Sequence, residues 1–261
     1  MSLRYEINDG VAVITLDRPD VLNAFNDELG AAATWRVREA SEDGSVRCIV
    51  ITASGRAFSS GEDLAALAGG YERGEAPPLG DTLRNRYNPL IRAIRAAPKP
   101  VVAAVNGVAA GAGVSVALAC DFRIASERAK LVLAFVKVGL VPDAGSIWFL
   151  AKAIGAPRAF ELAASGDVLD AERAYELGLF TEVVPEDEFE ERWRSFAAEL
   201  ATGPTRAYAL IKRLLDSASR SSLDEQLDLE VGAQSEAGAT KDHLEGVQAF
   251  FEKRPPRFEG N

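Results

Sequence analysis

Asp143 is the residue whose type and setting in the sequence fit acid–base chemistry most closely. It follows Pro142 within residues 140–146, and Phe135 is one of several apolar neighbours. Burial among apolar side chains disfavours the charged form of a carboxylate and raises its pKa toward neutral pH, where a proton-transferring group works best. Aspartate is also a preferred N-cap residue, so Asp143 could instead begin a helix that runs to about residue 154.

Two glycine-containing turns could supply backbone N–H groups to a ligand. Residues 55–64 and residues 106–113 each follow a predicted buried strand and precede a predicted helix. The first N–H groups of a helix have no partner inside it, so two such ends that converge on one oxygen form an oxyanion hole. Glycine-rich corners also occur for packing alone. Neither turn has the spacing of a Rossmann G-x-G-x-x-G loop or of a P-loop, which disfavours nucleotide binding.

Ser115 allows a different class of chemistry. Residues 113–117 read Gly-Val-Ser-Val-Ala, which is close to the G-x-S-x-G elbow of serine hydrolases. A serine nucleophile needs a base, and the one histidine is His243, in a polar stretch near the C-terminus. A hydrolase is therefore a distant alternative. The cysteines, Cys48 and Cys120, lie in apolar runs, so the sequence also predicts no metal site.

The overall composition restricts the class of partner. The chain has 261 residues, of which 48% are hydrophobic and 26% charged, and its formal net charge is −10. These values are typical of a soluble globular protein, and the negative charge disfavours a nucleic-acid partner. No apolar run reaches the roughly 20 residues that span a bilayer, and no basic segment followed by an apolar stretch begins the chain. We therefore expect a cytoplasmic protein with no membrane partner.

Short β-type runs alternate with helical segments in the first half of the chain. Residues 11–16, 46–52 and 101–105 are apolar and largely β-branched, which predicts strands. Asn26 has the residue type and position of an N-cap for a helix that ends near Ala40. This alternation favours an α/β architecture. We also predict a helix over residues 81–96, a small-residue helix ending at 119 and an edge strand over 121–125.

The remainder of the chain is predicted to be nearly all helical from about residue 170. Leu223, Leu227 and Val231 recur at four-residue spacing, so their helix needs an apolar surface on its own core or on another subunit. Residues 69–80 are rich in glycine, proline and charge, which predicts a mobile loop near a site.

Taken together and in this order, these stretches resemble the enoyl-CoA hydratase/isomerase (crotonase) superfamily. The resemblance implies an α/β fold with a spiral core of repeated β-β-α turns over residues 1–200 and a helical oligomerisation region over residues 201–261. It also implies a homotrimer or a dimer of trimers. The match covers nearly the whole chain and includes residues 17–26, 57–64, 99–121, 139–145, 176–179 and 249–254.

The resemblance further implies an acyl-CoA thioester substrate, with coenzyme A as part of the substrate and no separate cofactor or metal. The thioester carbonyl would accept hydrogen bonds from the N–H groups of Glu62 and Ala112, whose side chains we expect to have no electrostatic role. Asp143 completes the predicted catalytic set. The predicted substrate and CoA contacts are Arg18, Asn23, Ala24, Ser59, Ser60, Gly61, Asp63, Leu64, Gly111, Pro142, Phe250 and Lys253. The last two would close over the CoA from the same or a neighbouring subunit.

Two departures from the superfamily pattern indicate which reaction to expect. Ser115 and Phe135 stand where hydratases carry the two glutamates that activate water, whereas Asp143 stands where several isomerases carry a working aspartate. Residues 86–90, 134–143 and 223–230 resemble most closely the isomerases that act on ring-epoxyphenylacetyl-CoA in phenylacetate degradation. We therefore expect an acyl-CoA isomerase. An enoyl-CoA hydratase is the nearest alternative, and a non-catalytic CoA-binding subunit is a distant one.

Overall fold

The structure, a computed structural model, describes residues 2–261 and contains two β-sheets. The larger sheet has six strands. Strands β1 and β2 form an antiparallel hairpin, whose turn residues Asp9 and Gly10 both have positive φ, as a type I′ turn requires. The other neighbouring strands are parallel. In spatial order the strands are β1 (Leu3–Asn8), β2 (Val11–Leu16), β3 (Cys48–Ala53), β5 (Val101–Val105), β7 (Phe122–Ser126) and β10 (Glu182–Val184).

Two details of the larger sheet differ from the prediction. Strand β3 begins two residues later than predicted. The predicted edge strand, β7, is not at an edge, because β10 pairs with its other side. Strand β10 has only three residues and lies between helices, so the helical pattern of its surroundings concealed it.

A second, four-stranded sheet holds the turns that were predicted to be glycine-rich corners. Its order is β4 (Ala57–Ser59), β6 (Val108–Ala110), β8 (Lys130–Val132) and β9 (Val168–Asp170). Strands β4 and β6 pair in parallel. Each corner therefore contains a short strand before its helix, which was not predicted. Successive passes of strand, short strand and helix form the predicted β-β-α spiral, and the predicted fold class is confirmed.

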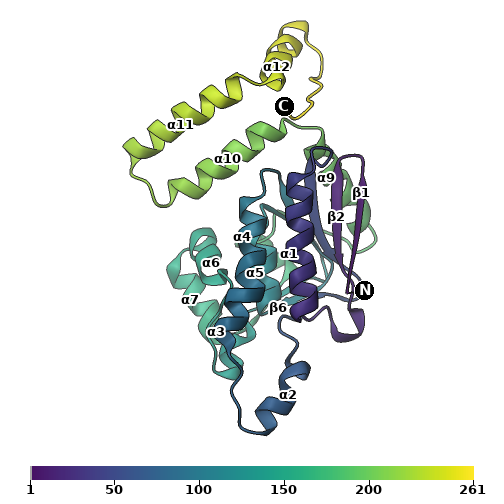
Figure 1. Ribbon diagram of the computed structural model, residues 1–261, viewed down its shortest axis with the longest axis vertical. Coiled ribbons are helices and arrows are strands. Elements are labelled where there is room, and N and C mark those ends of the chain that lie inside the picture. Colours follow the sequence, from purple (N-terminus) through teal and green to yellow (C-terminus); the bar gives the residue numbers. More distant parts are fainter. Residues whose placement is uncertain (1) are drawn as a thin grey trace.

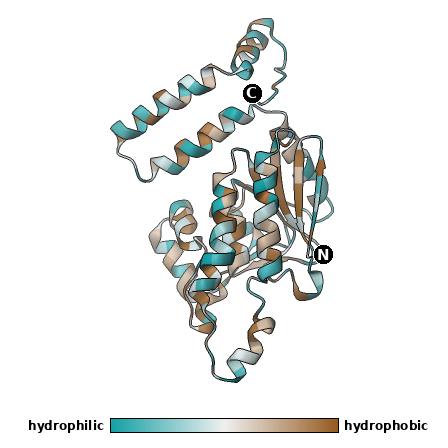
Figure 2. Cartoon of the chain, in the orientation of Figure 1, coloured by the Kyte–Doolittle hydropathy of each residue, from teal (hydrophilic) through white to brown (hydrophobic). Residues whose placement is uncertain are grey.

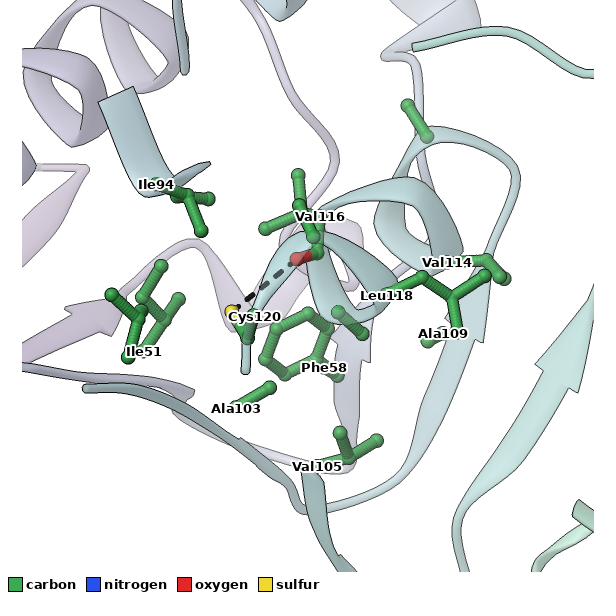
Figure 3. Packing of buried hydrophobic residues seen from close by; sticks show 14 of the residues in the cluster. Ile51, Phe58, Ile94, Ala103, Val105, Ala109, Val114, Val116, Leu118 and Cys120 are labelled. Atoms are coloured by element: carbon green, nitrogen blue, oxygen red, sulfur yellow. Dashed lines mark hydrogen bonds between the residues drawn. The ribbon is translucent and has the colours of Figure 1, made fainter. Parts of the chain in front are cut away.

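Helices cover one face of the larger sheet (Figure 1). Helix α1 (Asp27–Glu42) begins where predicted, because the Asn26 side chain accepts a hydrogen bond from the N–H of Leu29. Helix α4 (Asn88–Ala96) and helix α5 (Ala112–Ala119) complete the layer. Phe58, from β4, is fully buried in the core near Val114 and Leu118 of α5 (Figure 3).

The segment between β4 and α4 is more helical than predicted. It consists of α2 (Leu64–Glu72), α3 (Leu79–Thr82) and a π-helical turn (Leu83–Tyr87). The expected loop over residues 69–80 is confined to residues 73–78. Asp63 caps α2 through a hydrogen bond from the N–H of Ala66, and the Leu/Ala-rich first turn outweighs the two glycines that follow.

Short helices follow the second sheet, and a helical arm ends the chain. Helix α9 (Phe189–Ala201) packs Trp193 onto the other face of the larger sheet. The arm projects from the core (Figure 1), and hydrophobic residues recur along its helices (Figure 2). Several of them, including Leu215, Leu223 and Phe250, have exposed side chains. No helix within residues 2–261 is both long enough and apolar enough to cross a bilayer. The other helices are η1 (Pro19–Val21), η3 (Ala134–Val138), α6 (Ser146–Ile154), α7 (Ala156–Ser165) and α8 (Ala171–Glu176), and the arm comprises α10 (Thr205–Ala218), α11 (Leu223–Gly238) and α12 (Lys241–Glu252).

Candidate active site

A largely apolar cavity of about 240 Å³ contains the predicted catalytic residues. It lies between α2, α3 and the π-helical turn on one side and the start of α5 with the η3 segment on the other. Glu62 and Asp143 are the two carboxylates in its wall. The lining residues are Ser60, Glu62, Leu64, Tyr71, Leu79, Thr82, Leu83, Tyr87, Gly111, Ala112, Ala134, Phe135, Val138, Leu140, Val141 and Asp143.

The pairing of β4 with β6 brings the two predicted backbone donors together. A Cβ atom added to Gly61 would lie 2.8 Å from the carbonyl oxygen of Ala110 and 3.2 Å from the nitrogen of Ala112, so the two turns are in contact. Neither the Glu62 nor the Ala112 N–H donates a hydrogen bond to another group within residues 2–261. Ala112 is also the first residue of α5, where the helix dipole favours negative charge. The pair can therefore stabilise an anionic oxygen.

A backbone bridge to Phe25 holds the first donor in place. The Phe25 N–H donates to the carbonyl of Gly61 at 2.6 Å, and the Asp63 N–H donates to the carbonyl of Phe25 at 3.0 Å. The bridge thus fixes the peptide groups on either side of Glu62 and leaves the Glu62 N–H free to bind a ligand.

The Asp143 carboxyl has the environment of a general base. Its Oδ1 is buried and has no hydrogen-bond partner within residues 2–261. Burial, and then the negative charge of Glu62, raise the pKa of Asp143 from 3.8 to about 6. The carboxylate is therefore mostly ionised at neutral pH and able to accept a proton. The N-cap alternative is wrong, because α6 begins at Ser146 with Gly145 at its N-cap.

The Glu62 side chain is a component of the site that sequence reasoning missed. Its carboxylate accepts hydrogen bonds from Arg86 Nη1 at 2.5 Å and from Tyr87 Oη at 2.7 Å. Arg86 is also anchored to Asp27 at 2.6 Å. We expected no electrostatic role for Glu62, and this expectation is wrong, because its charge raises the pKa of Asp143. The Glu62 carboxylate therefore belongs to the same residue as one of the two backbone donors, the Glu62 N–H.

Glu62→Gln should shift the pH dependence of the reaction. The variant keeps the N–H donor but removes the charge that raises the pKa of Asp143, so that pKa falls toward its usual range. The acid limb of kcat, expected near the Asp143 pKa of about 6, should therefore move to lower pH. A kcat–pH profile measures the shift. An unchanged limb, or one displaced to higher pH, would contradict this coupling.

The predicted CoA contacts near Arg18 form a hydrogen-bonded scaffold beside the cavity. Asn23 is fully buried, and its side chain donates to the carbonyls of Ser54 and Ala57 while accepting from the Arg18 N–H. Arg18 pairs with Asp63 at 2.9 Å. The Asn23 amide therefore makes its hydrogen bonds inside the protein, and they hold β4, the strand that precedes Glu62.

The other predicted contacts are divided between the cavity and more distant positions. Ser60, Leu64 and Gly111 line the cavity, whereas Pro142 is next to the cavity residues Val141 and Asp143. Ala24, Ser59 and Gly61 are buried behind the wall. Phe250 and Lys253 lie at the end of α12, at the opposite end of the molecule from α2 (Figure 1), and do not line this cavity.

Within one chain, Ser115 and His243 do not form the serine–histidine pair that the hydrolase alternative requires. Ser115 is fully buried, and its hydroxyl donates to the backbone carbonyl of Asp143 at 3.0 Å. His243 is on α12 in the arm, whereas Ser115 is in α5 in the core (Figure 1). The hydroxyl is thus engaged by a carbonyl and not by a base.

Comparison with known proteins agrees with the observed fold. Residues 6–261 match the family model described as enoyl-CoA hydratase/isomerase. A probable enoyl-CoA hydratase of Rhodobacter capsulatus is 46% identical over 259 residues, covering 99% of this chain and 98% of that protein. The 1,2-epoxyphenylacetyl-CoA isomerase of Escherichia coli is 44% identical over 254 residues, 97% of each chain.

Solved structures show the same similarity in three dimensions. The crystal structure of an enoyl-CoA hydratase from Bacillus anthracis superposes with a TM-score of 0.93 at 32% identity and covers 100% of both chains. The match therefore extends over the spiral core and the arm. On the evidence of its sequence, its fold and these relatives, the chain belongs to the enoyl-CoA hydratase/isomerase family.

Proposed function

We propose that this protein is an acyl-CoA isomerase that moves a proton along the acyl chain of a bound thioester. The observation that carries the proposal is the buried, unpartnered Oδ1 of Asp143 in the same cavity as the N–H groups of Glu62 and Ala112. A proton acceptor beside two donors is what the formation and collapse of an enolate require.

For a 3-enoyl thioester the steps follow from this geometry. Asp143 takes a proton from carbon 2, and the electron pair of that C–H bond moves into the thioester carbonyl. The resulting enolate oxygen is held by the N–H groups of Glu62 and Ala112. Asp143 then returns the proton to carbon 4, and the double bond comes into conjugation with the carbonyl. The carboxylate is regenerated and no water is consumed.

Hydration is the second candidate, because the Rhodobacter capsulatus relative is named as a hydratase. Adding water across a double bond requires carboxylates free to orient and deprotonate it. Phe135 gives the cavity an apolar wall, and the hydroxyl of Ser115 is bound to a carbonyl. The carboxylate of Glu62 is engaged by Arg86 and Tyr87. These features support isomerisation over hydration.

The natural substrate that we propose is 2-(1,2-epoxy-1,2-dihydrophenyl)acetyl-CoA, with unsaturated linear acyl-CoA as a further substrate. The name of the Escherichia coli relative supports the first assignment. Tyr71, Tyr87 and Phe135 supply aromatic surface, and about 240 Å³ is enough for a six-membered ring or a medium-length chain. With this substrate, the metabolic role of the protein would be in the catabolism of phenylacetate.

We also propose that the arm joins copies of the chain into a trimer or a dimer of trimers. Exposed apolar surface of this kind marks interaction sites in soluble proteins. The exposed large apolar side chains of the arm include Leu215, Leu223, Val231, Leu244, Phe250 and Phe251. In such an assembly Phe250 and Lys253 would reach the CoA of a neighbouring subunit.

The proposed function predicts a simple difference between two substrates. With trans-3-hexenoyl-CoA, the ultraviolet absorbance of the conjugated thioester should appear, because the double bond moves into conjugation. With crotonyl-CoA, the same absorbance should persist, because no water is added. Rapid loss of the crotonyl-CoA signal would establish a hydratase. Release of CoA thiol would indicate a hydrolase, and tight CoA binding without α-proton exchange would indicate a non-catalytic subunit.

A further inference from the structure

The backbone carbonyl of Asp143 accepts three hydrogen bonds. The N–H and the hydroxyl of Ser146 donate to it, each at 2.9 Å, and the hydroxyl of Ser115 donates at 3.0 Å. The Ser146 bonds are local, since that residue is three positions away. Ser115 comes from α5, 28 positions away in the sequence, and is the donor that ties this carbonyl to a different element.

The position of the Asp143 side chain depends on this main-chain anchor. Its Oδ1 has no hydrogen-bond partner within residues 2–261, so no bond to that atom fixes its direction. The residue that follows, Ala144, has a φ of 47°, which is an unfavourable left-handed conformation for a residue with a Cβ atom. Such a conformation persists when surrounding bonds hold the chain in it. The three hydrogen bonds that the Asp143 carbonyl accepts hold this turn.

Helix α5 carries the oxyanion donor as well as the anchor. Ala112 is its first residue, and Ser115 is three positions later, so the two lie on the same side of the helix. Every residue of α5 is buried. Gly113 packs so closely on β4 that an added Cβ would lie 2.6 Å from the carbonyl oxygen of Ser59. The helix therefore has little freedom to shift, and groups attached to it keep their spacing.

We propose that Ser115 is a positioning residue that sets the separation between the Asp143 carboxylate and the oxyanion donor Ala112 by binding the Asp143 carbonyl to α5. The inference rests on the proposed function, because it assigns Ser115 a role in placing the base of that reaction. Ser115 is fully buried and does not line the cavity, so it has no surface to offer a substrate there. Its hydroxyl acts through the backbone of Asp143.

Ser115→Ala tests the proposal with trans-3-hexenoyl-CoA as substrate. The Asp143 carbonyl keeps its two bonds from Ser146, so the turn stays folded but is no longer tied to α5. Because small displacements of a catalytic group have large effects on rate, kcat should fall about 10-fold to 100-fold while KM changes less than about 2-fold. A kcat within about 2-fold of the wild-type value would overturn the proposal.

A double variant separates this role from a purely structural one. In the Asp143→Asn background, Ser115→Ala should cause no further loss of the residual rate, because Ser115 acts only through Asp143. An additional loss equal to that in the wild-type background would overturn the proposal. If Asp143→Asn alone retained full activity, the proposed function itself would fail. Normal behaviour of Asp143→Asn with a silent Ser115→Ala would remove only the positioning role.

Two further variants control for folding. Thr52→Val deletes a buried hydroxyl that donates to the carbonyl of Ala104 at 3.0 Å, away from the cavity, and should leave kcat unchanged. Ser115→Cys keeps nearly the same volume with a much weaker donor, so it should reproduce the kcat loss without the cavity that alanine leaves. Wild-type kcat in a folded Ser115→Cys protein would overturn the proposal. A kcat loss in Thr52→Val equal to that in Ser115→Ala would do so too.

Discussion

Asp143→Asn is expected to lower kcat for 3-enoyl-CoA isomerisation by about 10²–10⁴-fold, the usual contribution of a positioned general base. The amide has nearly the shape of the carboxyl group but cannot accept the substrate proton. The N–H groups of Glu62 and Ala112 remain, so the affinity for an acyl-CoA should change little. Steady-state kinetics and calorimetric titration with a non-reactive acyl-CoA measure the two quantities. Undiminished turnover would remove Asp143 from the mechanism.

The stability of the same variant provides an internal control. In the unfolded chain the pKa of Asp143 is near 3.8, and in the folded protein it is about 6. The folded state therefore binds more protons between these values, and its stability falls as pH rises through this range. Above it, ionisation costs on the order of 3 kcal/mol, which asparagine avoids. Asp143→Asn should therefore melt higher than the wild type at about pH 7.5, and this difference should shrink toward about pH 5.

Gly61→Ala is expected to produce the second large loss, about 10²–10³-fold in kcat/KM. Gly61 has a φ of 89°, and an added Cβ would lie 2.8 Å from the carbonyl oxygen of Ala110 and 3.2 Å from the nitrogen of Ala112. Both neighbours are backbone atoms that cannot rotate away. The new methyl group would therefore push the two turns apart, and the N–H groups of Glu62 and Ala112 would no longer converge on one oxygen.

Gly178→Ala is the matched control for Gly61→Ala. Gly178 also has a positive φ, 74°, but an added Cβ would meet nothing within 4 Å. It should therefore show the backbone strain alone, about 1–2 kcal/mol of stability, with near-normal kinetics. If both variants lost activity equally, the loss would reflect strain in general. If Gly61→Ala kept its activity, the two amides would not act as a pair.

Much of the fold was predictable because its signals are local. The N-cap at Asn26 and the apolar runs of β2 and β5 placed these elements correctly. The three-residue strands β4, β6 and β10 were missed, because a strand that short has no measurable period and is defined by its pairing partner. The helix over residues 64–72 was obscured by Gly69 and Gly70, whose low propensity is overcome by the capped, Leu/Ala-rich start.

The site was predictable to the extent that its members lie in motifs. Asp143, Glu62 and Ala112, the catalytic set that the family resemblance implied, all line one cavity, and their roles stay a prediction. The contact of Glu62 with Arg86 and Tyr87 could not be read in advance, because it joins residues 24 and 25 positions apart through side-chain directions that only the packed structure defines. A glutamate between Gly61 and Asp63, followed later by the Arg86-Tyr87 pair, is the signal available in the sequence.

Hydrogen exchange at carbon 2 of a thioester that has no double bond to move isolates the proton-abstraction step of the proposed mechanism. The protein, incubated with phenylacetyl-CoA in deuterium oxide, should introduce deuterium at this carbon, as followed by proton NMR. Removal of that proton by Asp143, with the carbonyl held between the N–H groups of Glu62 and Ala112, is sufficient for exchange. We expect exchange by the wild type and none above the solvent background by Asp143→Asn. Equal exchange by the two proteins, or no exchange by a wild type that isomerises 3-enoyl-CoA, would contradict the proposed mechanism.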